Sequence, residues 1–265
     1  MMWKWEVDHT KAKGVFVIVH GAGEYHARYK WIIEQLNRMD YHVIMGDLPG
    51  QGTTPGPRGH VPTFDLYIET VNKWLKEAKE YDLPTILFGH SMGGLISTRT
   101  LMKEDVNYLP DMVILSSPCF GLFNKTPFSK KTVSLMLNKV TPSLRFNSAL
   151  EPGSGTRDPQ MRARDEKDNL LIKKVSIRWY RELENSIKFA HQHVDTFPEI
   201  PLLVMQGGDD RIVSKFRVKE WFNRVDISDK YYKEWEGLYH EVLNEPEKSQ
   251  VMAHMLGFVT MHVNK

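Results

Sequence analysis

The run Gly89-His90-Ser91-Met92-Gly93-Gly94 places a serine between two glycines, each two positions away. Residues 85–88 before it are typical of a short buried strand, and residues 95–102 favour a helix. A serine at such a strand-to-helix turn is held in a strained backbone conformation, and the glycines let the two chain segments pass. The helix N-terminus favours negative charge that develops beside the serine. We therefore predict that Ser91 is a nucleophile. The alternative is an inert serine in a glycine-rich turn.

A nucleophilic serine needs a base that accepts its proton, and the chain contains eleven histidines. His254 and His262 fall in the predicted last helix, where a packed or solvated role is commoner. Among the other candidate histidines, His20 lies in the loop after an earlier strand and His90 lies in the serine turn. His191 and His193 lie where the chain returns from an insertion. His240 lies in a loop that directly follows the last predicted strand. We therefore predict His240 as the base.

The base in turn needs a carboxylate that orients it. Residues 207–211, Gly-Gly-Asp-Asp-Arg, follow the predicted strand at 200–205, and their glycines free the turn. Both Asp209 and Asp210 could orient the imidazole, while the other caps the turn or meets Arg211. The spacing alone leaves both open.

Backbone N–H groups near the serine could bind the oxyanion of an acyl-transfer reaction. One is the N–H of Met92, the residue after the nucleophile, and the other comes from the loop Gly21-Ala22-Gly23. That loop is a weak match to a dinucleotide-binding fingerprint, because His26 stands where its third glycine would fall. The sequence has no Walker motif, HExxH or metal-spaced cluster, so we expect no cofactor and no metal.

Strand-like and helix-like stretches alternate along most of the chain. Apolar runs typical of strands lie at Gly14–Val19, Tyr41–Gly46, 85–88, Met112–Ser116 and 200–205, with a further strand at Lys230–Trp235. Helical spacing covers 29–39, 64–81, 95–102 and 246–263, and residues 3–7 alternate as an edge strand does. This order predicts an α/β fold with a mostly parallel central sheet and helices on both faces.

Residues 118–196 interrupt this alternation and are predicted to form a helical cap between the core segments 1–117 and 197–265. The insertion shows no clear buried strand, and helical patches lie at 132–140 and 170–189. Residues 118–190 hold 14 Lys and Arg against 7 Asp and Glu, which leaves 21 against 26 in the rest of the chain. Such a cap suits an apolar tail with an anionic head or an anionic membrane surface. A solvated helical face over ordinary core residues is the alternative. The apolar residues near its start are Phe120, Leu122, Phe123, Phe128, Leu135, Met136 and Leu137.

Composition narrows the class of protein. The 265 residues are 41% hydrophobic and 26% charged, as in ordinary globular proteins, and a net charge of +2 gives no reason to expect nucleic acid. No apolar run approaches the ~20 residues that cross a bilayer, and residues 1–6 lack a signal-peptide core. We therefore expect a cytoplasmic protein that contacts a membrane at most transiently, through the basic cap. The single cysteine, Cys119, excludes an internal disulfide and is expected to be a packed residue.

Four runs carry a resemblance to a known family: 20–26 (His-Gly-Ala-Gly-Glu-Tyr-His), 47–52 (Asp-Leu-Pro-Gly-Gln-Gly), 89–94 and 207–211. Together they resemble monoacylglycerol lipases and the bacterial lysophospholipase-like members of the same α/β-hydrolase group. The resemblance implies the α/β-hydrolase fold, with Ser91 as nucleophile, Asp210 as acid and His240 as base. It also implies the N–H groups of Ala22 and Met92 as oxyanion donors. The cap matches in little beyond length, and Pro49 and Gln51 replace residues that are commonly histidine in the family.

The residues and the resemblance together predict a serine carboxylesterase that cleaves a single-chain lipid ester, a monoacylglycerol or a lysophospholipid, through an acyl-enzyme. One alternative uses the same nucleophile on amides, as in prolyl-aminopeptidase-like hydrolases, or for acyl transfer to another alcohol. A non-catalytic receptor on the same fold is an alternative of another class, and the complete Ser/Asp/His set argues against it.

Overall fold

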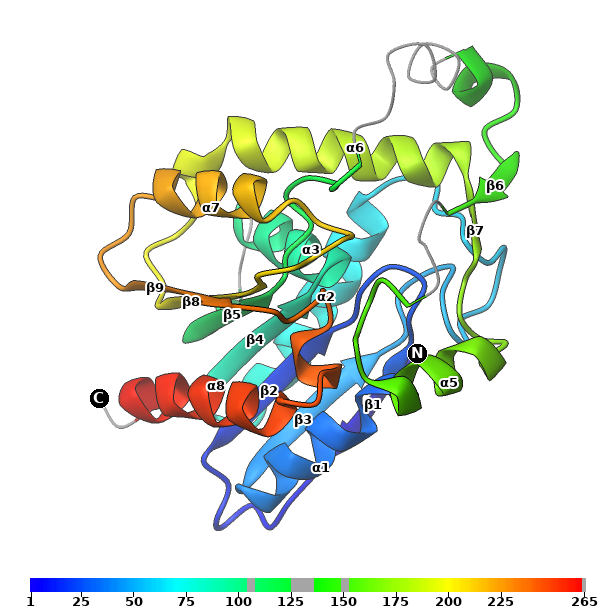
Figure 1. Cartoon of the computed structure of the whole chain (residues 1–265). Coiled ribbons are helices and arrows are strands. Elements are labelled where there is room, and N and C mark those ends of the chain that lie inside the picture. The colour runs from blue at the N-terminus through cyan, green and yellow to red at the C-terminus, as the bar shows by residue number, and fades with distance from the viewer. Residues whose placement is uncertain (104–107, 125–135, 149–152, 264–265) are drawn as a thin grey trace.

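The computed structural model describes residues 1–103, 108–124, 136–148 and 153–263. Across these residues, seven strands form one sheet in the order β1-β3-β2-β4-β5-β8-β9 (Figure 1). The strands are β1 (Met2–Trp5), β2 (Gly14–Val19), β3 (Tyr41–Gly46), β4 (Thr85–His90), β5 (Met112–Ser116), β8 (Leu202–Gly207) and β9 (Lys230–Trp235). Every neighbouring pair is parallel except β1 with β3, which is antiparallel. The predicted mostly parallel sheet is confirmed.

Burial explains the apolar runs of the inner strands. Every residue of β2, β3, β4, β5 and β8 is buried, because helices cover both faces of the sheet. The edge strand β9 instead contains only exposed and half-buried residues, which fits its charged sequence.

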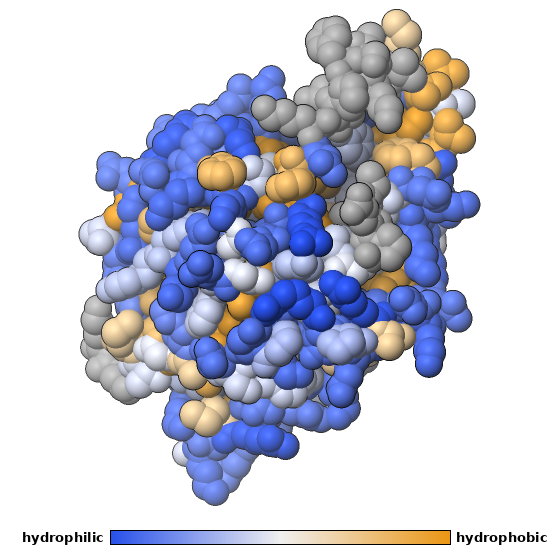
Figure 2. Space-filling view, in the orientation of Figure 1, coloured by the Kyte–Doolittle hydropathy of each residue, from blue (hydrophilic) through white to orange (hydrophobic). Residues whose placement is uncertain are grey.

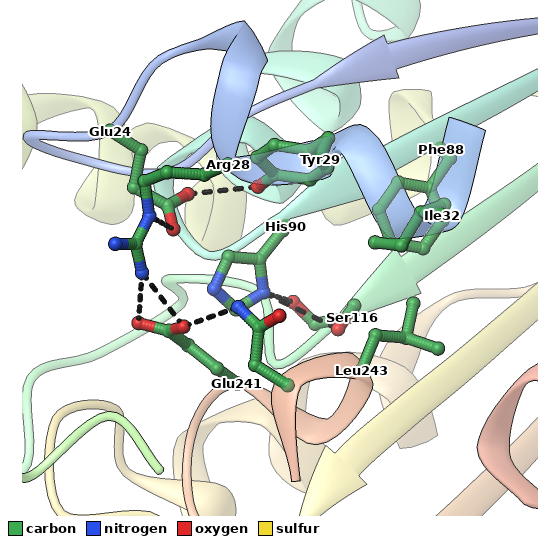
Figure 3. A pocket seen from close by; sticks show the side chains of 10 residues that line it. Glu24, Arg28, Tyr29, Ile32, Phe88, His90, Ser116, Glu241 and Leu243 are labelled. Carbon is green, nitrogen blue, oxygen red and sulfur yellow. Dashed lines mark hydrogen bonds and ion pairs between the residues drawn. The ribbon is translucent and has the colours of Figure 1, made fainter. Parts of the chain in front are cut away.

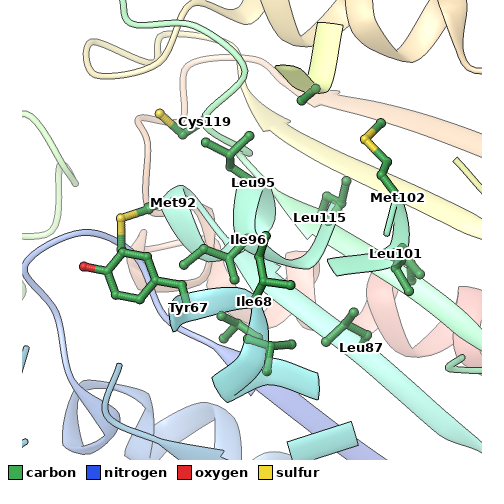
Figure 4. Close-up of a cluster of buried hydrophobic side chains, with 14 of the residues drawn as sticks. Tyr67, Ile68, Leu87, Met92, Leu95, Ile96, Leu101, Met102, Leu115 and Cys119 are labelled. Carbon is green, nitrogen blue, oxygen red and sulfur yellow. The ribbon is translucent and has the colours of Figure 1, made fainter. Parts of the chain in front are cut away.

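Helices cover the two faces of the sheet separately. On one face α1 (Lys30–Arg38) and α8 (Lys248–Val263) pack against strand residues such as Phe16 and Met205. On the other face lie α2 (Asp65–Lys79), α3 (Met92–Leu101) and α7 (Lys215–Arg224). Figure 4 shows part of this second cluster, where Ile68 of α2 and Ile96 of α3 pack with Leu87 and Leu115 of the sheet. The predicted helices on both faces are confirmed.

The described elements between β5 and β8 do not join the main sheet. They are the helical residues 136–140, β6 (Arg145–Asn147), α5 (Pro159–Lys167), β7 (Lys174–Ser176), α6 (Ile177–Gln192) and the 3-10 turn η2 (Val194–Thr196). The long helix α6 crosses above α3 on the α7 side of the sheet (Figure 1). These elements occupy the predicted insertion, and the division into a 118–196 cap between two core segments stays a prediction.

Several predicted boundaries are wrong inside the insertion. The helix predicted at 170–189 begins only at Ile177, where the Ser176 side chain accepts a hydrogen bond from the N–H of Trp179 at 3.1 Å and so caps the helix. The three residues before it form β7, which pairs with β6 as a small antiparallel ladder that the sequence did not indicate. One predicted boundary outside the insertion also differs: β1, at the start of the chain, ends at Trp5 and not at residue 7.

The apolar residues predicted near the start of the cap differ in burial. Phe120 is fully buried in the core, whereas Phe123 and Met136 are exposed. Of the helical patch predicted at 132–140, residues 136–140 are helical. Residues 132–135, which include Leu135, lie outside the described residues, as does Phe128. Within the described ranges, no helix has the length and apolar character that crossing a membrane requires.

Candidate functional site

The turn between β4 and α3 holds Ser91 in a backbone conformation that few residues adopt. Its φ and ψ are 53° and −120°, in the left-handed region of φ, and the residue is buried. Its N–H donates to the carbonyl of Ser116 at 2.9 Å, and its carbonyl accepts from the N–H of Cys119 at 2.9 Å. These two bonds fix the turn to the end of β5, which stabilises the strained residue.

The glycine after the serine leaves room for a neighbouring strand. A Cβ on Gly93 would lie 2.1 Å from the carbonyl oxygen of Val19 and 2.6 Å from that of His20. The first turn of α3 therefore packs directly on the backbone at the end of β2. Close approach of this kind is the physical reason for a glycine at this position.

His240 and Asp210 meet at the same edge of the sheet, each in a loop after a parallel strand. Nδ1 of His240 donates to Oδ2 of Asp210 at 2.8 Å, and both side chains are buried. Asp210 follows β8, and His240 follows β9, so the pairing of these two strands sets their separation. The neighbouring Asp209 is exposed. Of the two aspartates that the spacing left open, Asp210 is the one that contacts the histidine.

Four donors surround the carboxylate of Asp210. Oδ1 accepts from the N–H groups of Ile212 at 2.9 Å and Val213 at 2.8 Å. Oδ2 accepts from Nε2 of Gln206 at 2.9 Å, besides His240. Burial alone would raise the pKa of Asp210, but the charge of His240 and these donors lower it below its usual value. The carboxylate is therefore ionised at neutral pH.

The ionised carboxylate has the opposite effect on the histidine. Burial alone would lower the pKa of His240, but the charge of Asp210 and its hydrogen bond raise that pKa above the ordinary value. The same bond places the proton of a neutral imidazole on Nδ1 and leaves Nε2 as the acceptor. Such a tautomer can take a proton from a hydroxyl.

The histidine loop and the serine turn are adjacent. The ring of His240 lies 4.9 Å, centroid to centroid, from the ring of His90, which directly precedes Ser91. His90 itself bonds through Nδ1 to the carbonyl of Ser116 at 3.1 Å, and burial lowers its pKa. His90 is thus neutral and occupied by a backbone bond, which suits a structural role for it.

The loop after β2 lies against the serine turn. A Cβ on Gly21 would stand 3.1 Å from Cβ of Ser91. The N–H of Gly21 donates to Oε2 of Glu24 at 2.7 Å, and the carbonyl of Gly21 accepts from Nδ1 of His20 at 2.8 Å. Nε2 of His20 accepts in turn from the N–H of Leu48 at 3.0 Å. Gly21, the residue before Ala22, is therefore held next to the serine through both its N–H and its carbonyl.

Three charged or polar side chains at the site were assigned no role from the sequence: Gln206, Glu24 and Arg28. Gln206 is a polar residue near the end of an apolar strand, and that position is the signal that could have found it. Glu24 and Arg28 stand four residues apart and form an ion pair, with Nε of Arg28 at 3.1 Å from Oε1 of Glu24. Figure 3 shows both beside His90 and Glu241, around a cavity of about 20 Å³.

The other histidines have contacts of their own. Nε2 of His191 bonds to the carbonyl of Phe120 at 2.7 Å, and His262 in α8 bonds to Asp229.

Cys119 is buried, and burial raises the pKa of its thiol to about 12, so it is a packed residue as predicted. In the part of the chain that the structure describes, no group of three or more His, Cys, Asp or Glu side chains could hold a metal ion.

A protein-family model described as "Serine aminopeptidase, S33" matches residues 10–247 of the chain. The chain is 46% identical over 262 residues to "Phospholipase YtpA" of Bacillus subtilis, a match that covers 99% of this chain and all of that one. It is 27% identical to the "Monoacylglycerol lipase" of Mycolicibacterium smegmatis, over 98% of this chain and 92% of that one.

Solved structures agree with the sequence matches. The crystal structure of a monoacylglycerol lipase from Paleococcus ferrophilus superimposes with a TM-score of 0.88 at 27% identity, over 99% of this chain and 98% of that one. A monoglyceride lipase variant from Saccharomyces cerevisiae, solved with a substrate analogue, has the same TM-score at 23% identity and so shows the likeness of fold.

Proposed function

Because the chain belongs to the serine aminopeptidase S33 family of α/β-hydrolases, and is a lipid ester hydrolase of the serine type, we propose that Ser91, Asp210 and His240 form its catalytic triad. The observation that carries this proposal is the 2.8 Å bond between Nδ1 of His240 and Oδ2 of Asp210 beside the strained turn of Ser91. The three residues follow β4, β8 and β9, whose carboxyl ends share one edge of the sheet. Ligands and substrates bind at that edge in open α/β sheets.

In the first half of the reaction, Oγ of Ser91 attacks the ester carbonyl while Nε2 of His240 takes the hydroxyl proton. The ionised Asp210 stabilises the imidazolium that forms. The carbonyl oxygen becomes an oxyanion, which the N–H groups of Ala22 and Met92 bind. The intermediate then collapses, the ester C–O bond breaks, and His240 gives its proton to the departing alcohol.

In the second half, water attacks the acyl group on Ser91. His240 now takes a proton from that water, and the same two N–H groups bind the second oxyanion. Breakage of the bond to Oγ releases the fatty acid, and the proton returns to Ser91. The turnover consumes one ester and one water and needs no cofactor and no metal.

We propose that the substrate is a lipid ester with a single acyl chain, a monoacylglycerol or a lysophospholipid. The printed names of the relatives support this class, since they include a phospholipase and monoacylglycerol lipases. The family description names an aminopeptidase, so amide cleavage on the same triad is the alternative. Residues 118–196 are proposed to form the cap above the reacting ester.

A panel of substrates tests the proposal. Purified protein is assayed on a long-chain monoacylglycerol, a lysophospholipid, a diacyl phospholipid, and prolyl and alanyl amides, each beside Ser91→Ala. We expect the single-chain esters to be cleaved faster than all others and Ser91→Ala to lose that activity. Faster cleavage of the amides would contradict the substrate class, and faster cleavage of the diacyl lipid would contradict the single-chain requirement.

We also propose that the basic cap makes transient contact with an anionic membrane surface, where such a substrate resides. Exposed apolar side chains gather on the helical segment 136–140, on Leu144 and on β6, as Figure 2 shows, beside the exposed cations Lys139 and Arg145. The apolar residues are Met136, Val140, Leu144 and Phe146. This pairing of apolar and cationic side chains is typical of surfaces that bind anionic lipid.

Vesicle binding tests the membrane contact. We expect cosedimentation with phosphatidylglycerol vesicles to exceed that with phosphatidylcholine vesicles and to fall in Val140→Glu. Met261→Glu is the matched control, because Met261 is an exposed apolar residue on α8, outside the cap. Equal loss in the two variants, or no preference for the anionic vesicles, would contradict the proposed surface.

A further inference from the structure

Arg28 joins three segments that are far apart in the sequence. It lies in the 3-10 turn η1 (His26–Tyr29), and its side chain is only 2% exposed. The guanidinium contacts Glu24 in the loop after β2, Glu241 next to His240, and Asp165 in α5. Figure 3 shows Arg28 between Glu24 and Glu241. We call Arg28 and these three acids the Arg28 cluster.

The contacts use most of the donors of the guanidinium. Nε donates to Oε1 of Glu24 at 3.1 Å, and Nη2 donates to both oxygens of Glu241 at 3.1 and 2.9 Å. Nη1 and Nη2 both bond to the carboxylate of Asp165. Burial alone would lower the pKa of Arg28, but Glu241 and Glu24 raise it, so the cation is retained. One cation therefore holds together three anions that would otherwise repel one another.

Two of the three acids also hold parts of the proposed catalytic site. Oε2 of Glu24 accepts from the N–H of Gly21 and from the hydroxyl of Tyr29, which fixes Gly21, the residue just before the proposed oxyanion donor Ala22. Glu241 directly follows His240, and its N–H donates to the carbonyl of Gly155 in the insertion. Hydrogen bonds of the guanidinium therefore connect its position to the loop that contains Ala22 and to the loop that contains His240.

The third acid comes from a helix that polar contacts hold in place. None of the residues of α5 is buried, so apolar packing contributes little to holding this helix against the core. Around it, Tyr25 bonds to Asp168 at 2.7 Å, and Arg157 pairs with Glu245 and Glu247. Among these contacts, only the Arg28–Asp165 pair connects α5 to Glu24 and Glu241, because Arg28 pairs with all three acids.

We propose that Arg28 is a positioning residue, which makes the geometry of the oxyanion loop depend on how α5 is seated. When α5 sits on the core, Asp165 holds the guanidinium, the guanidinium holds Glu24, and Glu24 aligns the loop that carries Ala22. When α5 lifts, that alignment loosens, and stabilisation of the oxyanion weakens. The inference rests on the proposed function, because it gives the loop of Ala22 its role in the reaction.

The test compares two ways of loosening the same helix. Asp165→Asn keeps the shape of the side chain and removes its charge from the Arg28 cluster. Glu247→Gln is the matched control, because it weakens the Arg157 pair without touching that cluster. Both are assayed on p-nitrophenyl acetate, whose short acyl chain has little to gain from the cap. Arg28→Lys is a third variant, because lysine keeps the positive charge but lacks the planar set of N–H donors of the guanidinium.

Three readouts separate positioning from a loss of folding: kcat and KM, the inhibition constant of butylboronic acid, and the urea midpoint. The boronic acid forms a tetrahedral adduct on the serine, whose oxygen occupies the oxyanion hole. For Asp165→Asn we expect kcat to fall about 10-fold, KM to stay within about twofold, and the inhibition constant to rise by the same factor as kcat falls. Glu247→Gln should keep kcat and inhibition within about twofold at a similar urea midpoint.

Equal kcat and equal inhibition in Asp165→Asn and Glu247→Gln would overturn the inference, as would a fall in kcat that only follows the urea midpoint. If Arg28→Lys does not fold, Asp165→Asn and its control still decide. Failure of the proposed function looks different, because Ser91→Ala would then keep the turnover of the native protein. Ser91-dependent turnover with a normal Asp165→Asn variant would overturn only the role of Arg28.

Discussion

Gln206 and His240 donate to the same oxygen atom, Oδ2 of Asp210, at 2.9 Å and 2.8 Å. Gln206 is fully buried at the end of β8, and its Nε2 also lies 3.1 Å from the carbonyl of Gly207. Each donor draws electron density from the oxygen that the other one uses. Gln206 therefore lowers the basicity of the carboxylate that stabilises the imidazolium of His240.

Replacing Gln206 by leucine should raise the pKa of His240, because Asp210 loses a competing donor. One neutral hydrogen bond contributes about 1 kcal/mol, so we expect the acid limb of kcat/KM to move up by about half a pH unit. The measurement is a pH profile on a soluble ester. Asp209→Asn, at the exposed neighbour, serves as the control and should leave the limb in place. A limb that moves down in Gln206→Leu would contradict the assignment.

The two adjacent aspartates should differ sharply in their contribution to turnover. Asp210→Asn keeps the size of the side chain but favours the wrong tautomer of His240, and a loss of about 10⁴-fold in kcat is expected. Asp209→Asn changes an exposed side chain and should keep kcat within about twofold. Steady-state kinetics of both variants check this pair. Comparable losses in the two would show that Asp210 does not orient the base.

The native protein should lose activity on acidification at a pH above the ordinary histidine value. Activity needs neutral His240, and Asp210 raises the pKa of that imidazole above 6.5. The base is therefore protonated, and inactive, at pH values where an ordinary histidine is already neutral. We expect kcat/KM to rise with pH through a midpoint above 6.5. A midpoint below that value would mean that burial outweighs the carboxylate.

Two glycine-to-alanine changes should affect stability in opposite directions. Gly93→Ala forces a methyl group against the carbonyls of Val19 and His20, and we expect it to lower the free energy of unfolding by about 2 kcal/mol or more. Gly257 lies within α8, where a Cβ would meet no atom within 4 Å. Gly257→Ala should raise the free energy of unfolding by up to about 1 kcal/mol. Urea unfolding of both proteins gives the comparison.

The parts of the site that lie on short local motifs could be predicted from the sequence. The strand, serine and helix around Ser91 are consecutive residues, so local sterics demand the glycines that mark the turn. Asp210 and His240 each follow an apolar or charged strand, and parallel strands bring their ends to one edge. Chain order therefore paired His240 with the turn at residues 207–211, but it left Asp209 and Asp210 open. The family resemblance implied Asp210, and the structure shows its bond to His240.

The parts that depend on side-chain contacts between distant segments could not be predicted. Arg28 and Asp165 are 137 residues apart, and nothing local in either run indicates the other. The same holds for β6 and β7, three-residue strands stabilised by each other across the insertion. Gln206 is a partial exception, since a glutamine inside an apolar strand needs a buried partner.

If Ser91 forms a covalent intermediate with the help of His240, a serine-directed probe should trap the corresponding adduct. The native protein, Ser91→Ala and His240→Ala are each treated with a fluorophosphonate and analysed by intact-protein and peptide mass spectrometry. We expect one adduct on Ser91 in the native protein, none in Ser91→Ala, and labelling at least about 10²-fold slower in His240→Ala, on the order expected for loss of a general base. An adduct on another residue, or labelling of His240→Ala at the native rate, would contradict this mechanism.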